Sequence, residues 1–409
     1  MFSPSPATSE RSADSTRVRR RRRIGAATGA LALLVAASPF LPGDSGPRPA
    51  MTPRSNESSQ PTQAGAPGLG AITPELQAEI DRVVAEGPRS TVSPRSSAYA
   101  LAAAASRCAV FEGQRYCLGL GWTTQSQDEV ASRLATAAGP APGRTKPEQT
   151  GDLGALAALR RYSRLSPRER AAAERAELTA AARSVAKVWL IRHEIQGVPL
   201  PERFLEEHPE AALAARTSAR KHPRAFKILR EKQVRPQNRT YYCGPATAQM
   251  IAWGWRDRRQ GQALWADRLH TTSAGTSITD MVRVVNHNTG YDGDEHAGPY
   301  IVLDISDFTF AEWFRLMKKH LHTYQAPVVL HPILAKKYFP YLDDDASGHF
   351  QVGRGYDKNP GGQPMLSYFE PWDQSRFDPT EPRIARTQWQ SAYKSYRANR
   401  AHFQHNLGL

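Results

Sequence analysis

The apolar residues that follow the first seventy or so positions recur at helical spacing. Leu76, Ile80 and Val83 fall three or four positions apart, which predicts an amphipathic helix with one buried face. Thr73 has the side chain of an N-cap, and Pro74 suits the first helical position because its missing N–H would have no partner there. We therefore expect ordered structure to begin near Thr73.

Two further helices are expected in the same part of the chain. One starts at Ser93-Pro94 and runs through alanine-rich sequence, and the other follows Ser166-Pro167-Arg168-Glu169, which has the form of a capping box, and ends at Gly197. A linker containing proline and glycine, Gly139–Gly151, separates them. The pattern predicts a mostly α-helical region over residues 73–230.

The pattern changes to short alternating runs in the last quarter of the chain. Phe350, Val352 and Tyr356 alternate with smaller or polar residues, which predicts a strand that starts at His349. A second strand is expected at Met365–Phe369, and the sequence Asn359-Pro360-Gly361-Gly362 between the two is typical of a turn. The two strands are predicted to form a hairpin.

The tail of the chain has aromatic residues at helical spacing. Trp389, Tyr393 and Tyr396 predict a closing helix within Arg376–Leu409 that packs on the preceding domain. No chemistry is predicted for this tail.

The N-terminal residues have the three parts of an export signal. Arg19–Arg23 is a basic run, Ile24–Ala37 is apolar and uncharged, and small residues follow it. Residues 1–37 are therefore interpreted as an export signal, with an uncleaved membrane anchor as the alternative. Residues 38–72 are rich in Pro, Ser, Gly and Thr and are interpreted as a disordered linker. The rest of the chain is expected to be secreted.

The 409 residues carry a formal net charge of +15, but no basic block is interleaved with aromatic residues. We interpret the charge as a solvated basic face and expect no nucleic-acid partner. Three cysteines are too few for a disulfide-dense scaffold or for the common four-ligand zinc sites. In an exported chain Cys108 and Cys117 are expected to form a disulfide, which leaves Cys243 unpaired.

The unpaired cysteine stands in Gln237-Asn238-Arg239-Thr240-Tyr241-Tyr242-Cys243-Gly244-Pro245-Ala246. Ala246, Met250 and Ile251 predict a helix after it, so Cys243 is placed at a helix N-terminus, where the helix dipole favours the nucleophilic thiolate. Gln237 is the candidate donor to an oxyanion, together with the backbone N–H of Cys243.

A thiolate nucleophile needs a base and a group that orients the base. The hairpin places His349 opposite a residue near Trp372, so that Glu370 and Asp373 both fall close to the imidazole. Glu370 is the preferred third residue and Asp373 is its rival. A carboxylate at this position would accept the ring N–H of His349 and fix its tautomer.

These motifs resemble the papain-like cysteine peptidases of the double-glycine (bacteriocin-processing) type and their exported relatives, over about residues 230–375. The resemblance implies an α+β papain-like domain, here 231–409 with its C-terminal helix. It also implies Cys243 as nucleophile, His349 as base and Gln237 as oxyanion residue. That family usually has Asp before the proline, whereas this chain has Glu370.

The expected activity is hydrolysis of peptide bonds through a thioester, with a peptide or protein substrate and without a cofactor or metal. A cell-wall amidase or transpeptidase using the same residues is one alternative, and a non-catalytic binding protein that retains the fold is another. The helical region 73–230 is either an inhibitory propeptide or an independent binding module. The remaining histidines, including His331, show no convincing metal-ligand spacing. The oligomeric state and the substrate are not predicted.

Overall fold

The protein is described by a computed structural model that covers residues 69–87, 92–139, 148–211, 221–377 and 383–409. All of them belong to one compact unit, Pro61–Leu409. The predicted export signal lies outside the described residues, as does most of the predicted linker. In the described ranges no helix has the length and apolar character needed to span a membrane.

The fold is α+β, as predicted. Its helices are α1 (Pro74–Glu86), α2 (Ala98–Ala105), α3 (Gln127–Ala138), α4 (Ala155–Arg164), α5 (Pro167–Arg183), α6 (Val185–Ile191), α7 (Phe204–Glu207), α9 (Cys243–Arg256), α10 (Gln262–Arg268), α11 (Ile278–Asn288), α12 (Phe310–Lys318), α13 (Gln374–Phe377) and α14 (Ala392–Ala401). Its strands are β1 (Cys108–Phe111), β2 (Gln114–Cys117), β3 (Gly121–Thr123), β4 (Ala225–Lys227), β5 (Val302–Asp304), β6 (Val328–Leu330), β7 (Gln351–Asp357), β8 (Met365–Phe369), β9 (Thr387–Ser391) and β10 (Asn406–Gly408).

One sheet joins all of these strands. Its order is β1-β2-β3-β5-β10-β6-β7-β8-β9, and β4 pairs with β7. Neighbouring strands are antiparallel except β3 and β5, which are parallel. The β7–β8 hairpin predicted from the sequence is present, with Val352 opposite Phe369.

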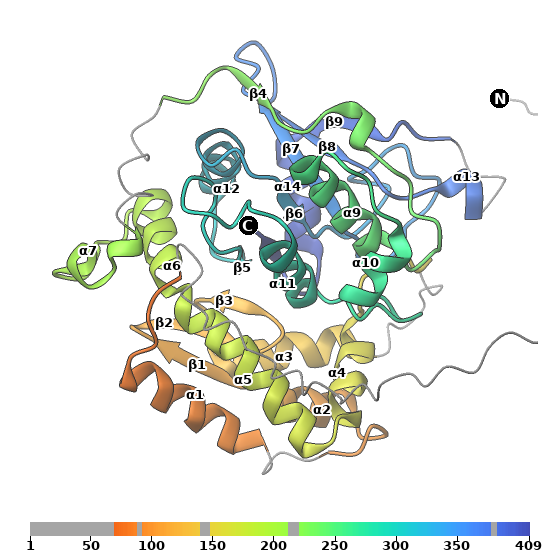
Figure 1. The fold of residues 1–409 in the computed structure, drawn as a ribbon. Helices are drawn as coiled ribbons and strands as arrows, with labels where there is room; N and C mark the ends of the chain where they lie inside the picture. The colour runs from red at the N-terminus through yellow and green to blue at the C-terminus, as the bar shows by residue number, and fades with distance from the viewer. Residues whose placement is uncertain (1–68, 88–91, 140–147, 212–220, 378–382) are drawn as a thin grey trace, which may run out of the picture. The chain divides into compact units, whose positions relative to one another are not determined.

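Helices cover both faces of the sheet (Figure 1). Val329 of β6 packs in a cluster with residues of α9 and α11, whereas its neighbours Val328 and Leu330 pack in a second cluster with α12 and α14. Successive side chains of a strand point to opposite faces, so this division follows from the strand geometry. The first cluster contains Cys243 and therefore positions the candidate site.

The predicted helix starts are largely confirmed. Thr73 caps α1 by accepting a hydrogen bond from the backbone N–H of Leu76, and Ser166 forms a capping box with Glu169 at the start of α5. The second helix starts later than predicted: Ser93-Pro94 lies in a turn, and Ser97 caps α2. Ser97 accepts from the N–H three positions on, which is the bond that defines the cap.

The region 73–230 is mostly helical, but it also contains strands that sequence analysis missed. β1 and β2 form a hairpin about Glu112-Gly113, both with positive φ, and Cys108 and Cys117 form a disulfide across it. β3 then pairs with β5, where Trp122 lies opposite Leu303. In Figure 1 the orange elements of this region group around these strands. The helical region therefore shares its sheet with residues 231–409.

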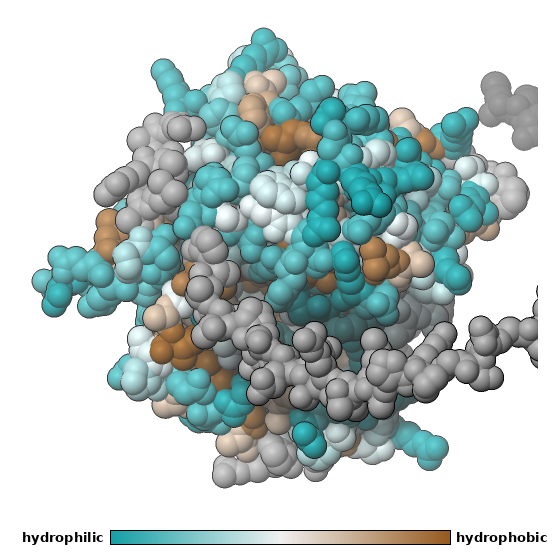
Figure 2. All heavy atoms as spheres, in the orientation of Figure 1, coloured by the Kyte–Doolittle hydropathy of each residue, from teal (hydrophilic) through white to brown (hydrophobic). Residues whose placement is uncertain are grey.

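The tail is not a single closing helix. Trp389 lies in β9 and is exposed, α14 begins only at Ala392, and β10 follows it. β10 lies between β5 and β6, near the middle of the sheet. On the face shown in Figure 2, hydrophilic residues cover most of the surface and hydrophobic residues form small separate patches.

Candidate active site

Cys243 is the first residue of α9, as the sequence pattern predicts. It is fully buried and is the free cysteine of the described residues. The hydroxyl of Thr247, one turn later, donates to the carbonyl of Phe350 at 3.2 Å and so joins α9 to the segment that carries His349. Cys243 and Phe350 also pack in the same buried cluster. The nucleophile candidate therefore lies beside the residue that directly follows His349.

Steric constraints explain why the residue after the nucleophile, Gly244, is a glycine. A Cβ atom at Gly244 would lie 2.6 Å from Oγ1 of Thr276. The loop before α11 can therefore approach the start of α9 only because position 244 has no side chain. This close approach fixes Thr276 beside the nucleophile.

The thiol of Cys243 is held in its neutral form in this conformation. Burial raises the pKa of Cys243 well above its usual range, and the charge of Asp152 adds to this increase. The backbone N–H groups of Phe350 and Gly244 act in the opposite direction but do not outweigh burial. The helix start is where the sequence predicts it, but the predicted preference for thiolate is wrong for this closed state.

His349 and Glu370 are in direct contact. His349 Nε2 lies 2.7 Å from Glu370 Oε1, and neither side chain is exposed. Glu370 follows β8 and His349 precedes β7, so the hairpin brings them together. Oε1 of Glu370 also accepts from the backbone N–H of Trp372 at 2.8 Å, and Oε2 accepts from Gln351 Nε2 at 2.7 Å and from the Tyr341 hydroxyl at 2.8 Å.

These hydrogen bonds fix the protonation states of the pair. Burial pushes the pKa of Glu370 upward, but the charge of His349 and the donated hydrogen bonds keep this pKa below its ordinary value. The ionised carboxylate accepts only, so His349 carries a proton on Nε2. Its Nδ1 is buried and has no hydrogen-bond partner among the described residues. That nitrogen can accept a proton in the neutral ring.

Asp373, the rival third residue, is engaged elsewhere. Its Oδ1 accepts from Arg386 Nη2 at 2.5 Å and from the Ser375 hydroxyl at 3.2 Å. Both partners belong to the segment that follows β8, on the way to β9. The structure thus pairs the imidazole with Glu370 and pairs Asp373 with a guanidinium.

Gln237 is fully buried near the start of α9. Its Nε2 donates to three carbonyl oxygens, those of Thr150 at 3.0 Å, Arg239 at 2.9 Å and Thr240 at 2.8 Å. Two amide hydrogens therefore serve three acceptors. The donor predicted for an oxyanion is present but occupied in this conformation, in part by residue 150.

Residues 148–153, which we call the strap, cross the site between its two sides. The carbonyl of Glu148 accepts from the N–H of Ser347 at 2.8 Å, and the Thr150 hydroxyl donates to the carbonyl of Gly348 at 2.7 Å. On the other side, the carbonyl of Gly151 accepts from the N–H of Thr276 at 2.9 Å. Sequence analysis placed the first part of this segment in a linker, because proline and glycine there resemble turn chemistry.

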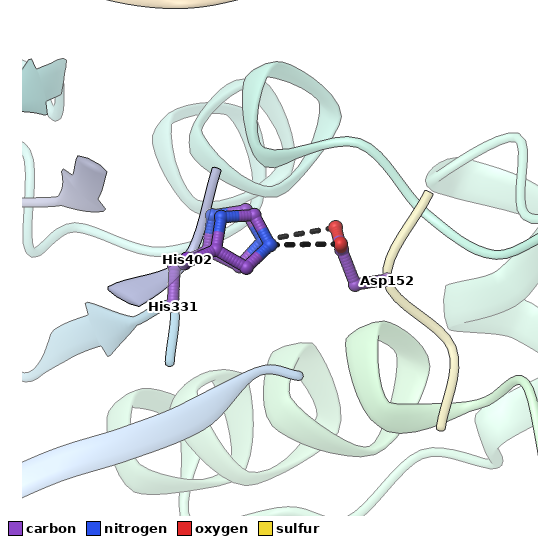
Figure 3. A group of neighbouring side chains, drawn as sticks. All are labelled: Asp152, His331 and His402. Carbon is purple, nitrogen blue, oxygen red and sulfur yellow. Dashed lines mark hydrogen bonds and ion pairs between the residues drawn. The ribbon is translucent and has the colours of Figure 1, made fainter. Parts of the chain in front are cut away.

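A carboxylate clamp anchors the strap (Figure 3). Asp152 accepts from His331 Nε2 through Oδ1 at 2.9 Å and from His402 Nε2 through Oδ2 at 3.0 Å. Burial alone would raise the pKa of Asp152, but the two histidines hold it well below its usual range. Burial and the neighbouring His331 lower the pKa of His402 to about 4.

Asp152, His331 and His402 each offer one atom that could bind a metal ion, and these three atoms lie within 4.8 Å of one another. Their hydrogen bonds assign them otherwise. His402 Nδ1 accepts from the N–H of Gln404 at 3.2 Å, so its proton is on Nε2, which is then a donor and not a ligand. His331 Nδ1 faces Oδ1 of Asn406 at 2.7 Å. Both nitrogens of His331 thus face oxygen atoms of neighbouring side chains, and neither is directed at an open metal position.

One of three comparisons with known proteins returns a match, and it covers the part of the chain that carries Cys243, His349 and Glu370. Residues 231–399 match the family described as the Peptidase_C39 like family. This match supports a relationship with the C39 papain-like cysteine peptidases and covers less than half of the chain. A search of curated proteins and a search of solved structures each return no significant match.

Proposed function

We propose that this protein is an exported cysteine peptidase related to the papain-like peptidases of the double-glycine type. It would hydrolyse peptide bonds with Cys243, His349 and Glu370. The observation that carries the proposal is the pair formed by His349 and Glu370: the carboxylate accepts a hydrogen bond from Nε2–H, and Nδ1 has no hydrogen-bond partner among the described residues. The next residue, Phe350, accepts from Thr247 of α9. The family match over residues 231–399 supports the same reaction class.

The chemistry follows from these positions. Nδ1 of His349 takes the proton of the Cys243 thiol, and the sulfur attacks the substrate carbonyl. The C–N bond then breaks, His349 gives the proton to the leaving amine, and a thioester remains on Cys243. Water, activated by His349, releases the acid and restores the thiol. Glu370 positions the ring and stabilises its charged form.

Export is part of the proposal. The basic run and apolar stretch of residues 1–37 support it, and so does the disulfide between Cys108 and Cys117, because such bonds persist in oxidising compartments. A peptide or protein substrate outside the cytoplasm is expected.

Peptide hydrolysis by defined variants tests the activity. We expect Cys243→Ala and His349→Ala to lower kcat by at least ~10³-fold. His287→Ala, which alters an exposed histidine on α11, serves as the control and should keep full activity. Because the site is closed in this structure, the assay is run both in the wild type and in Gly151→Ala. The Cβ atom added at residue 151 would clash with the backbone of Tyr241 and is expected to displace the strap. Hydrolysis that survives Cys243→Ala contradicts the proposal.

A further inference from the structure

The strap lies between the segment before His349 and the segment of Thr276 beside Gly244, and we call the space that it fills the groove. The strap forms hydrogen bonds to both segments. The backbone carbonyl of Glu148 and the side-chain hydroxyl of Thr150 bond to the segment before His349, and the backbones of Gly151 and Leu153 bond to Thr276 next to Gly244. The N–H of Leu153 donates to the carbonyl of Thr276 at 2.9 Å. Main-chain bonds of this kind are how an extended peptide is held in a groove.

The carbonyl of Thr150 takes a hydrogen bond that a substrate would need. It accepts from Gln237 Nε2 at 3.0 Å, the donor that the family resemblance assigns to the oxyanion. The next residue lies directly against the nucleophile's backbone: a Cβ atom at Gly151 would lie 2.6 Å from the carbonyl carbon of Tyr241 and 3.0 Å from the backbone nitrogen of Cys243. The strap thus follows a path that a bound substrate would follow.

The clamp on Asp152 holds the strap in that place. His331 comes from the loop after β6 and His402 from the end of α14, so two distant segments fix a single side chain of the strap. Thr150, Gly151, Asp152 and Leu153 are all buried. An ionised carboxylate that is buried and bonded on both oxygens is costly to remove, because its partners would be left unpaired.

We propose that this groove is the peptide-binding groove of the enzyme and that the strap is its intramolecular occupant, so that the chain is latent until the strap leaves. The proposal rests on the proposed function for the identity of the groove. It also explains why Cys243, His349, Gln237 and Glu370 are all closed to solvent. The ligand class is an extended peptide that replaces the main-chain bonds of residues 148–153.

The reactivity of Cys243 tests the proposal without relying on peptidase activity. With Cys108 and Cys117 in a disulfide, an alkylating reagent reports on Cys243. Gly151→Ala adds a methyl group where the backbone of Tyr241 leaves no room, and Gly151 has φ +117°, so we expect the strap to leave and labelling to be at least tenfold faster. Gly154→Ala is the matched control, since a Cβ atom there meets nothing within 4 Å.

Labelling of Gly151→Ala and of Gly154→Ala together tests whether the strap covers Cys243. Gly154→Ala should label as slowly as the wild type, and fast labelling of the wild type itself would overturn the proposal. A folded Gly151→Ala protein that labels no faster than the wild type would also overturn it. If Gly151→Ala fails to fold, Asp152→Asn replaces it, because the loss of charge weakens the clamp without removing its shape, and unchanged labelling overturns the proposal in the same way.

Failure of the proposed function has a different signature. If Gly151→Ala exposes Cys243 but no peptide is hydrolysed, the strap is a cover and the protein is not a peptidase. If the wild type hydrolyses peptides at the rate of Gly151→Ala, the peptidase stands and the strap is not inhibitory.

Discussion

Nε2 of His349 lies 2.7 Å from Oε1 of Glu370, and the hairpin register accounts for the contact. Val352 pairs with Phe369, so continuation of that register sets position 349 opposite position 372, with Glu370 two residues away. The carboxylate that the hairpin brings to the imidazole is therefore that of a glutamate. Its side chain is anchored by Gln351 and Tyr341.

The carboxylate variants separate Glu370 from Asp373. We expect Glu370→Gln to lower kcat by ~10²-fold or more, because the amide no longer stabilises the charged imidazole. Asp373→Asn should keep kcat within about twofold, since Asp373 bonds to Arg386 and not to His349. Steady-state kinetics in an open-strap background measure both. A larger loss in Asp373→Asn than in Glu370→Gln would contradict the assignment.

Acid should open the strap. In the closed state burial, together with the neighbouring His331, lowers the pKa of His402 to about 4, and exposure to solvent in an open state raises it toward its ordinary value of about 6.5, although the charge of Asp152, which favours the protonated ring, is then lost. The open state therefore binds more protons between pH 4 and the open-state pKa of His402, and the contribution of His402 to closure is fully present only above that pKa. Asp152, whose pKa is also lowered, loses its contribution at still lower pH. The other titratable groups that act on His402 are His331 and His405.

We expect the open population to rise as the pH falls from about 6.5 to 4, by less than tenfold per unit. The rate at which Cys243 reacts with a pyridyl disulfide, a reagent that also works in acid, measures this population. His402→Gln retains a donor but cannot titrate, so its profile should be flat over the same range. A profile identical to that of the wild type would contradict the role of His402.

The two halves of the chain should unfold together. β3 pairs with β5, and Asp304 of β5 accepts from Thr123 at 2.9 Å and from Arg133 at 3.0 Å, both in the helical region. A fragment of residues 221–409 would remove both of these donors to Oδ2 of Asp304 and expose the edge of β5. We predict that such a fragment shows no cooperative thermal transition by circular dichroism. A fragment that melts cooperatively would show that the halves are independent.

The disulfide should add stability to the β1–β2 hairpin. Cys108 and Cys117 are nine positions apart, and closing a loop of this size is worth about 2–3 kcal/mol. We expect the double variant Cys108→Ala, Cys117→Ala to lose about that amount of unfolding free energy, with Cys243 still buried. Denaturant unfolding measures it. Equal midpoints for the variant and the wild type would contradict the estimate.

The parts of the site that depend on local structure could be predicted from the sequence. A hairpin turn, alternating apolar residues and a helical apolar stripe are short-range signals. They place Cys243 correctly at a helix start and Glu370 directly after a strand, whereas the strand predicted to start at His349 begins two residues later, at Gln351. A buried or covered thiol is expected for an exported protein, but the segment that covers it could not be predicted, because it lies far away along the chain. The charge of Asp152, 91 positions before Cys243, is one such remote influence.

The hydrogen bonds of Asp152 with His331 and His402 show which contacts short-range sequence patterns cannot predict. Asp152 bonds to residues 179 and 250 positions away, and no spacing rule connects them. The strands β1–β3 were missed because they are three or four residues long and lie between alanine-rich helices. The tail looked helical because Trp389, Tyr393 and Tyr396 have helical spacing, although Trp389 lies in a strand.

The most direct test of catalysis is the mass of the intact protein after brief incubation with an activated peptide ester. In the Gly151→Ala background we predict one acyl adduct, located on Cys243, which disappears with time in the presence of His349 and accumulates slowly or not at all in His349→Ala. An adduct on another residue, or an adduct on Cys243 that forms equally fast without His349, would contradict the proposed mechanism.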